Sequence, residues 1–93
     1  MTISIDFSVS EDADHSIQLS PSSSLTETET EIVNNLTALL GDSKLTVIMN
    51  AAGGWAGGNI SDSKVCLNAE LMWKQSCGTS ILSGVIASRF LSA

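Results

Sequence analysis

The chain has 93 residues and a net charge of −6 at pH 7, which leaves room for one small domain. With 43% hydrophobic residues and a mean hydropathy of +0.25, it is too apolar for a disordered polyelectrolyte. Four Lys and Arg stand against ten Asp and Glu, so no positive stripe can neutralise phosphates, and nucleic acid and anionic membranes are excluded as partners. The chain contains no tyrosine, which excludes a mechanism in which its own tyrosine transfers a proton.

The N-terminus and the apolar stretches predict a cytoplasmic chain. Met1–Asp6 has neither the basic region nor the apolar run of a secretory signal. The longest apolar uncharged stretch, residues 75–88, is too short to span a bilayer. Cys66 and Cys77 are too far apart along one helix for a disulfide, and we expect both to be small buried hydrophobic residues rather than a metal or redox pair.

Two short strands are predicted first along the chain. Apolar and polar residues alternate over residues 3–7, which predicts a strand that ends at the acid Asp6. An acidic, turn-forming segment follows, and residues 16–19 form a second candidate strand. His15, the only histidine, lies in polar acidic surroundings, which favours a surface residue over a catalytic base.

A helix is predicted next. Ser24 and Glu27 have the spacing of a capping box, so the helix begins near Leu25, and Gly41 is placed to end it. Its apolar stripe consists of Leu25, Ile32, Val33, Leu36, Leu39 and Leu40.

The second half predicts a strand, a glycine-rich loop and a long helix. Leu45–Met49 is nearly all apolar, which suits a strand buried on both faces of a parallel sheet. Residues 51–59 hold four glycines and three alanines around Trp55, a composition that no regular element uses. The helix is expected over Val65–Phe90, with an apolar stripe of Leu67, Leu71, Met72, Leu82, Val85, Ile86 and Phe90. The order of elements predicts an α/β fold with a parallel sheet.

Two features point to nucleotide chemistry. An acid at the end of a strand, here Asp6, can accept hydrogen bonds from both ribose hydroxyls, and its charge repels a 2′-phosphate. A glycine-rich loop after a strand lets a flat ligand approach the backbone, which favours a site at residues 51–59. Trp55 either stacks on such a ligand or folds back on the core. The sequence has no phosphate-loop, nucleophile-elbow, C-x-x-C or H-x-x-x-H motif, so a serine, cysteine or metal mechanism has no assembled partners.

The runs Asn50-Ala-Ala-Gly-Gly-Trp-Ala-Gly-Gly-Asn59 and Leu71-Met-Trp-Lys-Gln-Ser76 closely resemble the dihydropteridine reductases of the short-chain dehydrogenase/reductase family. These oxidoreductases use NADH to reduce quinonoid dihydrobiopterin to tetrahydrobiopterin. The likeness extends over nearly all 93 residues. It implies a partial Rossmann-like parallel sheet with about three strands and two main helices. Residues 1–93 would form one partial NAD(P)-binding domain, from the second strand to the long helix, with no second domain.

The resemblance also implies roles for individual residues. Asp6 would bind the adenosine ribose of NADH, with NADPH disfavoured. Ala52, Gly53 and Gly54 would line the adenine and ribose side of the cofactor cleft. Trp55 would lie at the site of the pterin substrate and stack on its flat rings.

Along the long helix, Ser76 falls where many family members carry an asparagine that organises a proton-relay water. Because this chain has a serine there, the catalytic role of the family's asparagine is not carried over to Ser76. Ala51 likewise replaces the second asparagine of the family's strand end. Family members dimerise through the long helix, which implies a homodimer through Val65–Phe90.

Two parts of the family's machinery are missing from these residues. The first strand and its glycine-rich pyrophosphate loop precede the family's second strand, and here Met1 stands directly before that strand. The Tyr-x-x-x-Lys pair follows the family's fifth strand. The resemblance therefore predicts an internal fragment that lacks the first strand and has no turnover alone. Two alternatives stay open: a non-catalytic interaction fragment that pairs with an intact subunit through Val65–Phe90, and a generic small nucleotide-binding α/β protein.

Overall fold

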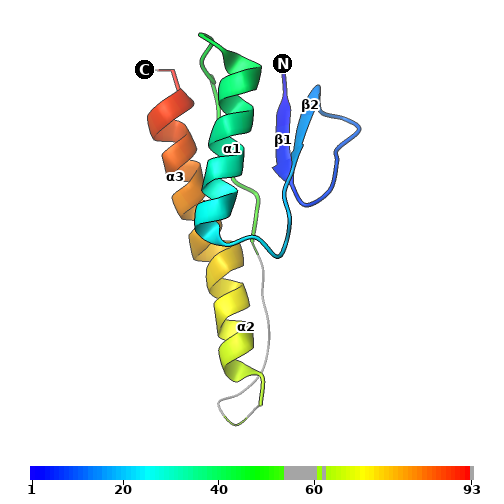
Figure 1. The fold of residues 1–93 in the computed structure, drawn as a ribbon, viewed down its shortest axis with the longest axis vertical. Coiled ribbons are helices and arrows are strands. Elements are labelled where there is room, and N and C mark those ends of the chain that lie inside the picture. Colours follow the sequence, from blue (N-terminus) through cyan, green and yellow to red (C-terminus); the bar gives the residue numbers. More distant parts are fainter. Residues whose placement is uncertain (54–60, 62, 93) are drawn as a thin grey trace. The chain divides into compact units, whose positions relative to one another are not determined.

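The computed structural model (Figure 1) describes residues 1–53, 61 and 63–92. The chain divides into two units, Met1–Ser43 and Lys44–Ala93, and each is described by itself. The elements of the first unit are β1 (Ile3–Asp6), β2 (His15–Gln18) and α1 (Leu25–Leu40). Those of the second are α2 (Val65–Met72), the π-helical segment η1 (Trp73–Gly78) and α3 (Thr79–Phe90). The described residues thus form a small α/β protein with one two-stranded parallel sheet, one separate helix and one long composite helix.

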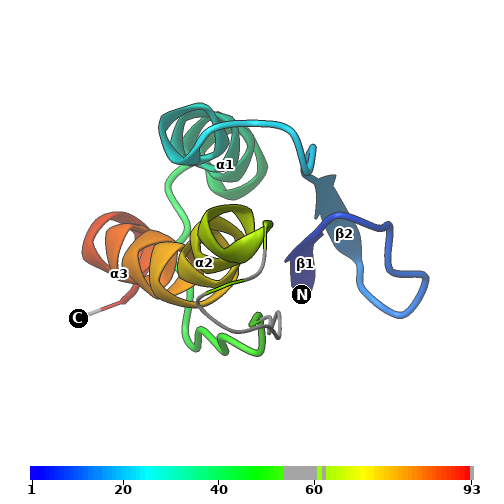
Figure 2. The ribbon, with the colours of Figure 1, turned by 90° about the horizontal axis from the view of Figure 1, so that it is seen from below.

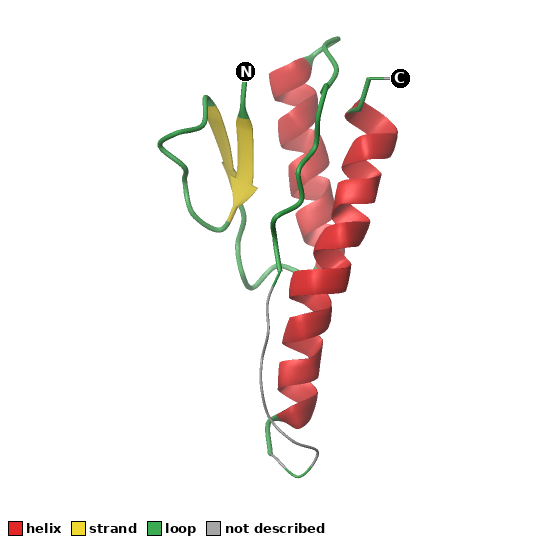
Figure 3. Ribbon diagram, turned by 180° about the vertical axis from the view of Figure 1, so that it is seen from behind, coloured by secondary structure: helices red, strands yellow, loops and turns green. Residues whose placement is uncertain are grey.

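The strands β1 and β2 pair in parallel, with Ile3 opposite His15 and Asp6 opposite Gln18 (Figure 3). One more backbone bond, from the N–H of Leu19 to the carbonyl of Asp6 at 2.8 Å, extends the pairing past the last matched residues. Both predicted strands are confirmed, the second beginning and ending one residue earlier than expected. His15 is exposed, as predicted.

Only residues 7–14 connect the two parallel strands, which is shorter than the dozen or so residues such a connection usually needs. Side-chain hydrogen bonds stabilise this short connection. The hydroxyl of Ser16 accepts from the N–H of Ser10 at 3.0 Å and donates to the Ser10 carbonyl at 3.2 Å. The Nε2 of Gln18 donates to the carbonyl of Phe7 at 3.0 Å. Each bond joins the connection to β2, so the chain turns back directly after β1 without an intervening helix.

Both ends of α1 form as the sequence predicts. The hydroxyl of Ser24 accepts from the N–H of Glu27 at 3.1 Å, and Oε1 of Glu27 accepts from the N–H of Ser24 at 3.3 Å, which completes the capping box. At the other end, Gly41 has a φ of +56° and its N–H donates to the carbonyl of Thr37 at 3.1 Å. A glycine adopts this left-handed φ without a Cβ penalty, so it terminates the helix. The buried side chains of α1 are Thr28, Ile32, Leu36 and Leu40.

The predicted strand Leu45–Met49 is wrong. Within the described residues only Leu45 makes a strand-like contact, an isolated parallel bridge with Leu91. Val47 is 71% exposed and Met49 is 88% exposed, although the pattern predicted burial on both faces. A strand of this kind forms only beside hydrogen-bonded neighbours in a sheet. The only sheet in the described part of the chain consists of β1 and β2, so it has two strands rather than about three.

The predicted helix over Val65–Phe90 is confirmed as one continuous run, which Figure 2 shows from its α2 end. Its predicted single apolar stripe is wrong, because α3 buries Leu82 and Ile86 whereas α2 buries no residue. The π-helical bonds of η1 reach five residues instead of four, so α2 and α3 do not share one rotational register. No helix in the part of the chain that the structure describes is both long and apolar enough to cross a membrane.

The prediction that the cysteines are buried is also wrong. Cys66 in α2 and Cys77 in η1 are both exposed free thiols. Cys66 stands on a helix that buries none of its residues, and in η1 only Gly78 is buried. The expectation depended on the usual burial of free cysteine, and these two lie on helical segments with almost no buried residue.

Candidate functional site

Asp6 stands at the carboxyl end of β1, the edge at which parallel sheets bind ligands. Its side chain is exposed, and Oδ1 accepts the N–H of Phe7 at 2.7 Å. This short bond fixes the carboxylate against its own backbone. Among the described residues Oδ2 has no hydrogen-bond donor. Since a carboxylate offers about four acceptor positions, Asp6 keeps the capacity to accept two hydroxyl donors from a ribose.

Phe7 adds a feature that the sequence pattern missed. The alternation over residues 3–7 grouped it with the inward residues of the strand, but β1 ends at Asp6 and the Phe7 ring is exposed. An exposed aromatic ring next to an anchored carboxylate offers apolar surface to a flat base. The turn-forming residues that follow Asp6 could have indicated this, because they end the strand before Phe7 and leave its ring unburied.

The residues before the glycine-rich loop form a local turn. Oδ1 of Asn50 accepts the N–H of Ala52 at 3.0 Å, an Asx-type bond that bends the backbone at the start of the loop. Ala52 and Gly53 are exposed. A Cβ built at Gly53 would meet no described atom within 4 Å, so protein packing does not require a glycine there. That open space suits a backbone that a flat ligand approaches closely. Gly54 and Trp55 lie outside the described residues, and their roles stay predictions.

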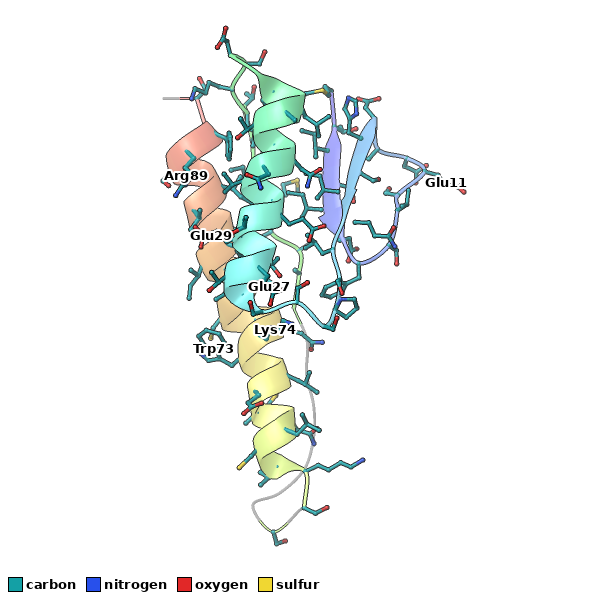
Figure 4. The ribbon with its side chains drawn as sticks, in the orientation of Figure 1. Glu11, Glu27, Glu29, Trp73, Lys74 and Arg89 are labelled. Atoms are coloured by element: carbon teal, nitrogen blue, oxygen red, sulfur yellow. The ribbon has the colours of Figure 1, made fainter. Side chains whose placement is uncertain are left out.

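Ser76 lies in the π segment η1, where Trp73 and Lys74 are also found (Figure 4). Its carbonyl oxygen accepts the hydroxyl of Thr79 at 3.0 Å and the hydroxyl of Ser80 at 3.1 Å. The backbone N–H of Thr79 donates to the same oxygen. Because a carbonyl has two lone pairs, this oxygen is saturated by donors of its own helix.

The predicted site residues lie in two separate units of the chain. Ala52 is joined by a hydrogen bond to Asn50, directly before the predicted site. Asp6 belongs to the first unit, whereas Gly53 and Ser76 belong to the second. A meeting of Asp6 with the glycine-rich loop therefore stays a prediction.

One carboxylate outside the candidate site, that of Asp14, has a lowered pKa. The backbone N–H of Thr2 donates to Oδ2 of Asp14 at 2.8 Å, and this bond holds the pKa of the Asp14 carboxyl below its ordinary value of 3.8. The Met1 amine, 3.9 Å from the same oxygen, lowers the pKa further. No group of three or more His, Cys, Asp or Glu side chains that could hold a metal ion occurs among the residues described.

Compared with models of known protein families, the chain matches none.

Proposed function

We propose that the chain is a segment of an NADH-dependent dihydropteridine reductase with a partial Rossmann-like fold of the short-chain dehydrogenase/reductase type. The observation that carries the proposal is the glycine-rich run from Asn50 to Asn59 followed by the Leu71–Ser76 run at the corresponding place in the long helix. The parallel pair of β1 and β2, with an acid at the end of β1, supports it. So does a long helix that follows the glycine-rich loop directly.

In this proposal Asp6 recognises the adenosine ribose. Its anchored carboxylate accepts hydrogen bonds from the 2′ and 3′ hydroxyls. A 2′-phosphate in the same place would bring negative charge against the carboxylate, so NADH is bound in preference to NADPH. The exposed backbone at Ala52 and Gly53 lines the adenine and ribose side of the cleft, where Gly53 leaves room for the ligand. Gly54 belongs to the same lining.

Trp55 stacks on the pterin substrate. A flat bicyclic ring presents two faces for an aromatic side chain, and stacking fixes its orientation without a charged partner. NADH supplies the hydride that reduces this substrate when the cofactor is bound. The residues of this chain bind and orient both flat molecules.

Residues 1–93 alone do not catalyse the reaction. The proton for the pterin requires an acid of suitable pKa, which the family takes from a tyrosine, and these residues contain none. The nicotinamide is held through a pyrophosphate loop, and no phosphate-loop motif occurs here. Catalysis therefore belongs to a longer protein that contributes both parts.

A chimera tests this proposal. Residues 1–93 replace the corresponding segment of an intact dihydropteridine reductase, and NADH oxidation is followed with quinonoid dihydropterin. We expect the chimera to turn over at a rate within about tenfold of the parent enzyme, a barrier change of about 1.4 kcal/mol. A folded chimera without activity would contradict the proposal, and the isolated chain, which we expect to be inactive, serves as the reference.

A second candidate function is non-catalytic pairing with an intact subunit through Val65–Phe90. Large apolar side chains exposed along this helix favour it: Leu67, Leu71, Trp73 and Ile81. The same surface would serve a homodimer of the chain. Co-purification of the chain with an intact dihydropteridine reductase would support this function, and a strictly monomeric profile in the mixture would contradict it.

A further inference from the structure

We propose that the hydroxyl of Thr79 stabilises a π-helical insertion in η1. This insertion sets the rotational register of α2 relative to α3. This inference goes beyond the proposed function and does not depend on it. It concerns one continuous helix within the second unit.

The positions of two leucines around the helix illustrate the effect of the insertion. Leu71 and Leu82 are eleven residues apart, and at about 100° per residue they would lie about 20° apart on an unbroken α-helix. In the structure Leu82 is 9% exposed and Leu71 is 41% exposed. A π turn adds one residue to the helix, which rotates everything on its N-terminal side by about 100°. The insertion in η1 therefore places Leu71 on a different side of the helix from Leu82.

Thr79 replaces the hydrogen bond that the α-helical register would need. In an α-helix the N–H of Thr79 would donate to the carbonyl of Gln75, four residues earlier. Here that N–H donates to the carbonyl of Ser76 instead. The Thr79 hydroxyl donates to the Gln75 carbonyl at 2.9 Å and to the Ser76 carbonyl at 3.0 Å. The Thr79 hydroxyl therefore donates to the Gln75 carbonyl in place of the Thr79 N–H, so this half-buried acceptor keeps a hydrogen bond.

The π segment joins regular helix at both ends. Met72, just before it, has φ −62° and ψ −42°, and Gly78, its last residue, has φ −60° and ψ −44°. Both pairs of angles are ordinary α-helical ones. Gly78 is buried and carries no side chain to lock either register. The hydroxyl of Thr79 is then the group that decides between them, with that of Ser80 contributing a further bond to the Ser76 carbonyl at 3.1 Å.

The test measures which carbonyl each amide bonds. Through-hydrogen-bond NMR couplings in the labelled full chain connect the amides of Cys77 and Gly78 to carbonyls five residues earlier in the π register and four residues earlier in the α register. We expect five-residue couplings in the wild type and their replacement by four-residue couplings in Thr79→Val. Thr79→Ser, which keeps the hydroxyl, retains the five-residue pattern.

Ser83→Ala is the matched control, because the Ser83 hydroxyl makes the same kind of bond to the Thr79 carbonyl, at 3.0 Å, within regular α-helix. We expect this variant to keep the five-residue couplings. Persistence of those couplings in Thr79→Val, or their loss in Ser83→Ala or Thr79→Ser, would overturn the proposal.

A deletion keeps the proposal testable if Thr79→Val does not fold. Removing Cys77 takes out the inserted residue, so the helix becomes α-helical throughout while α2 and α3 keep their present faces. We expect four-residue couplings and a wild-type helical circular dichroism signal. A deletion variant that keeps five-residue couplings, or loses helix signal relative to the wild type, would contradict the proposed insertion.

Discussion

Leu45 and Leu91 form an isolated parallel bridge that joins the segment before the glycine-rich loop to the C-terminal end of α3. The N–H of Leu45 donates to the carbonyl of Phe90 at 2.8 Å, and the N–H of Ser92 donates to the carbonyl of Leu45 at 2.7 Å. The first bond satisfies the last carbonyl of α3, one of those that an α-helix leaves without partners, and the second satisfies the carbonyl of Leu45 itself. They also fix the direction in which the chain leaves Leu45.

Replacing Leu45 by proline tests the bridge. Leu45→Pro removes the N–H that donates to the Phe90 carbonyl, and we expect it to lower the free energy of unfolding by about 1–3 kcal/mol relative to Leu45→Ala, which keeps the donor. Urea unfolding of both variants measures the difference. Equal midpoints for the two variants would show that the bridge contributes nothing.

The N-cap of α1 gives a second prediction. Ser24→Ala removes the acceptor for the Glu27 N–H, so the free energy of unfolding should fall by about 1 kcal/mol. Ser22→Ala is the control, because the Ser22 hydroxyl bonds only the hydroxyl of Ser20 in the preceding loop among the described contacts. Urea unfolding followed by circular dichroism compares them, and an equal loss in the control would rule out a specific capping contribution.

The lowered pKa of Asp14 predicts that the stability of the folded chain depends on pH. Its pKa is lowered in the folded chain, first by the backbone N–H of Thr2 and in addition by the Met1 amine, so the unfolded chain binds more protons than the folded chain at acid pH. The stability that this carboxylate contributes is therefore present above pH 3.8 and is lost as the pH falls through the lower, folded value. Carbon-detected NMR titration of Asp14 should give a pKa below 3.8 in the folded chain.

Variants of Thr2 separate the causes of this shift. Thr2→Pro removes the backbone donor together with the hydroxyl and should raise the pKa of Asp14 toward its ordinary value. Thr2→Val removes the hydroxyl, which donates to Oδ2 at 3.4 Å and accepts the Asp14 N–H at 3.1 Å, but keeps the backbone donor and should leave most of the shift. An unchanged Asp14 pKa in Thr2→Pro would show that another group causes the lowering.

Asp6 carries the prediction on cofactor binding. In the active chimera, Asp6→Ala should raise the KM for NADH about tenfold or more, because a charge-assisted hydrogen bond contributes about 1.5–3 kcal/mol. The KM for the pterin should stay within about twofold, a difference of about 0.4 kcal/mol. Asp42→Ala, an exposed acid just after α1, is the control. If Asp6→Ala behaves as Asp42→Ala does, Asp6 does not bind the cofactor.

Local signals predicted the elements that depend on local interactions. The ends of α1 follow from Ser24, Glu27 and Gly41, whose hydrogen bonds lie within a few residues. The span Val65–Phe90 follows from helical periodicity, which needs no distant partner. The position of Asp6 at a strand end follows from the same short-range reasoning.

The errors have non-local or unusual causes. Leu45–Met49 has a strand's composition, but a strand needs a neighbour, and no pattern within those residues shows whether one is present. Cys66 and Leu71 are exposed because α2 buries none of its residues, and the burial of a helix depends on distant packing partners. The π segment after α2 includes side-chain hydrogen bonds from Thr79 to the carbonyls of Gln75 and Ser76. Apolar periodicity does not report such a bond, because threonine is common in ordinary helices as well.

The central claim, that residues 1–93 are a segment of a dihydropteridine reductase, is tested most directly by sequencing the transcript on both sides of these residues. We expect one open reading frame that encodes a strand and a glycine-rich pyrophosphate loop upstream, and a Tyr-x-x-x-Lys pair downstream. Flanking sequence that encodes neither, or in-frame stop codons directly before Met1 and after Ala93, would contradict the claim.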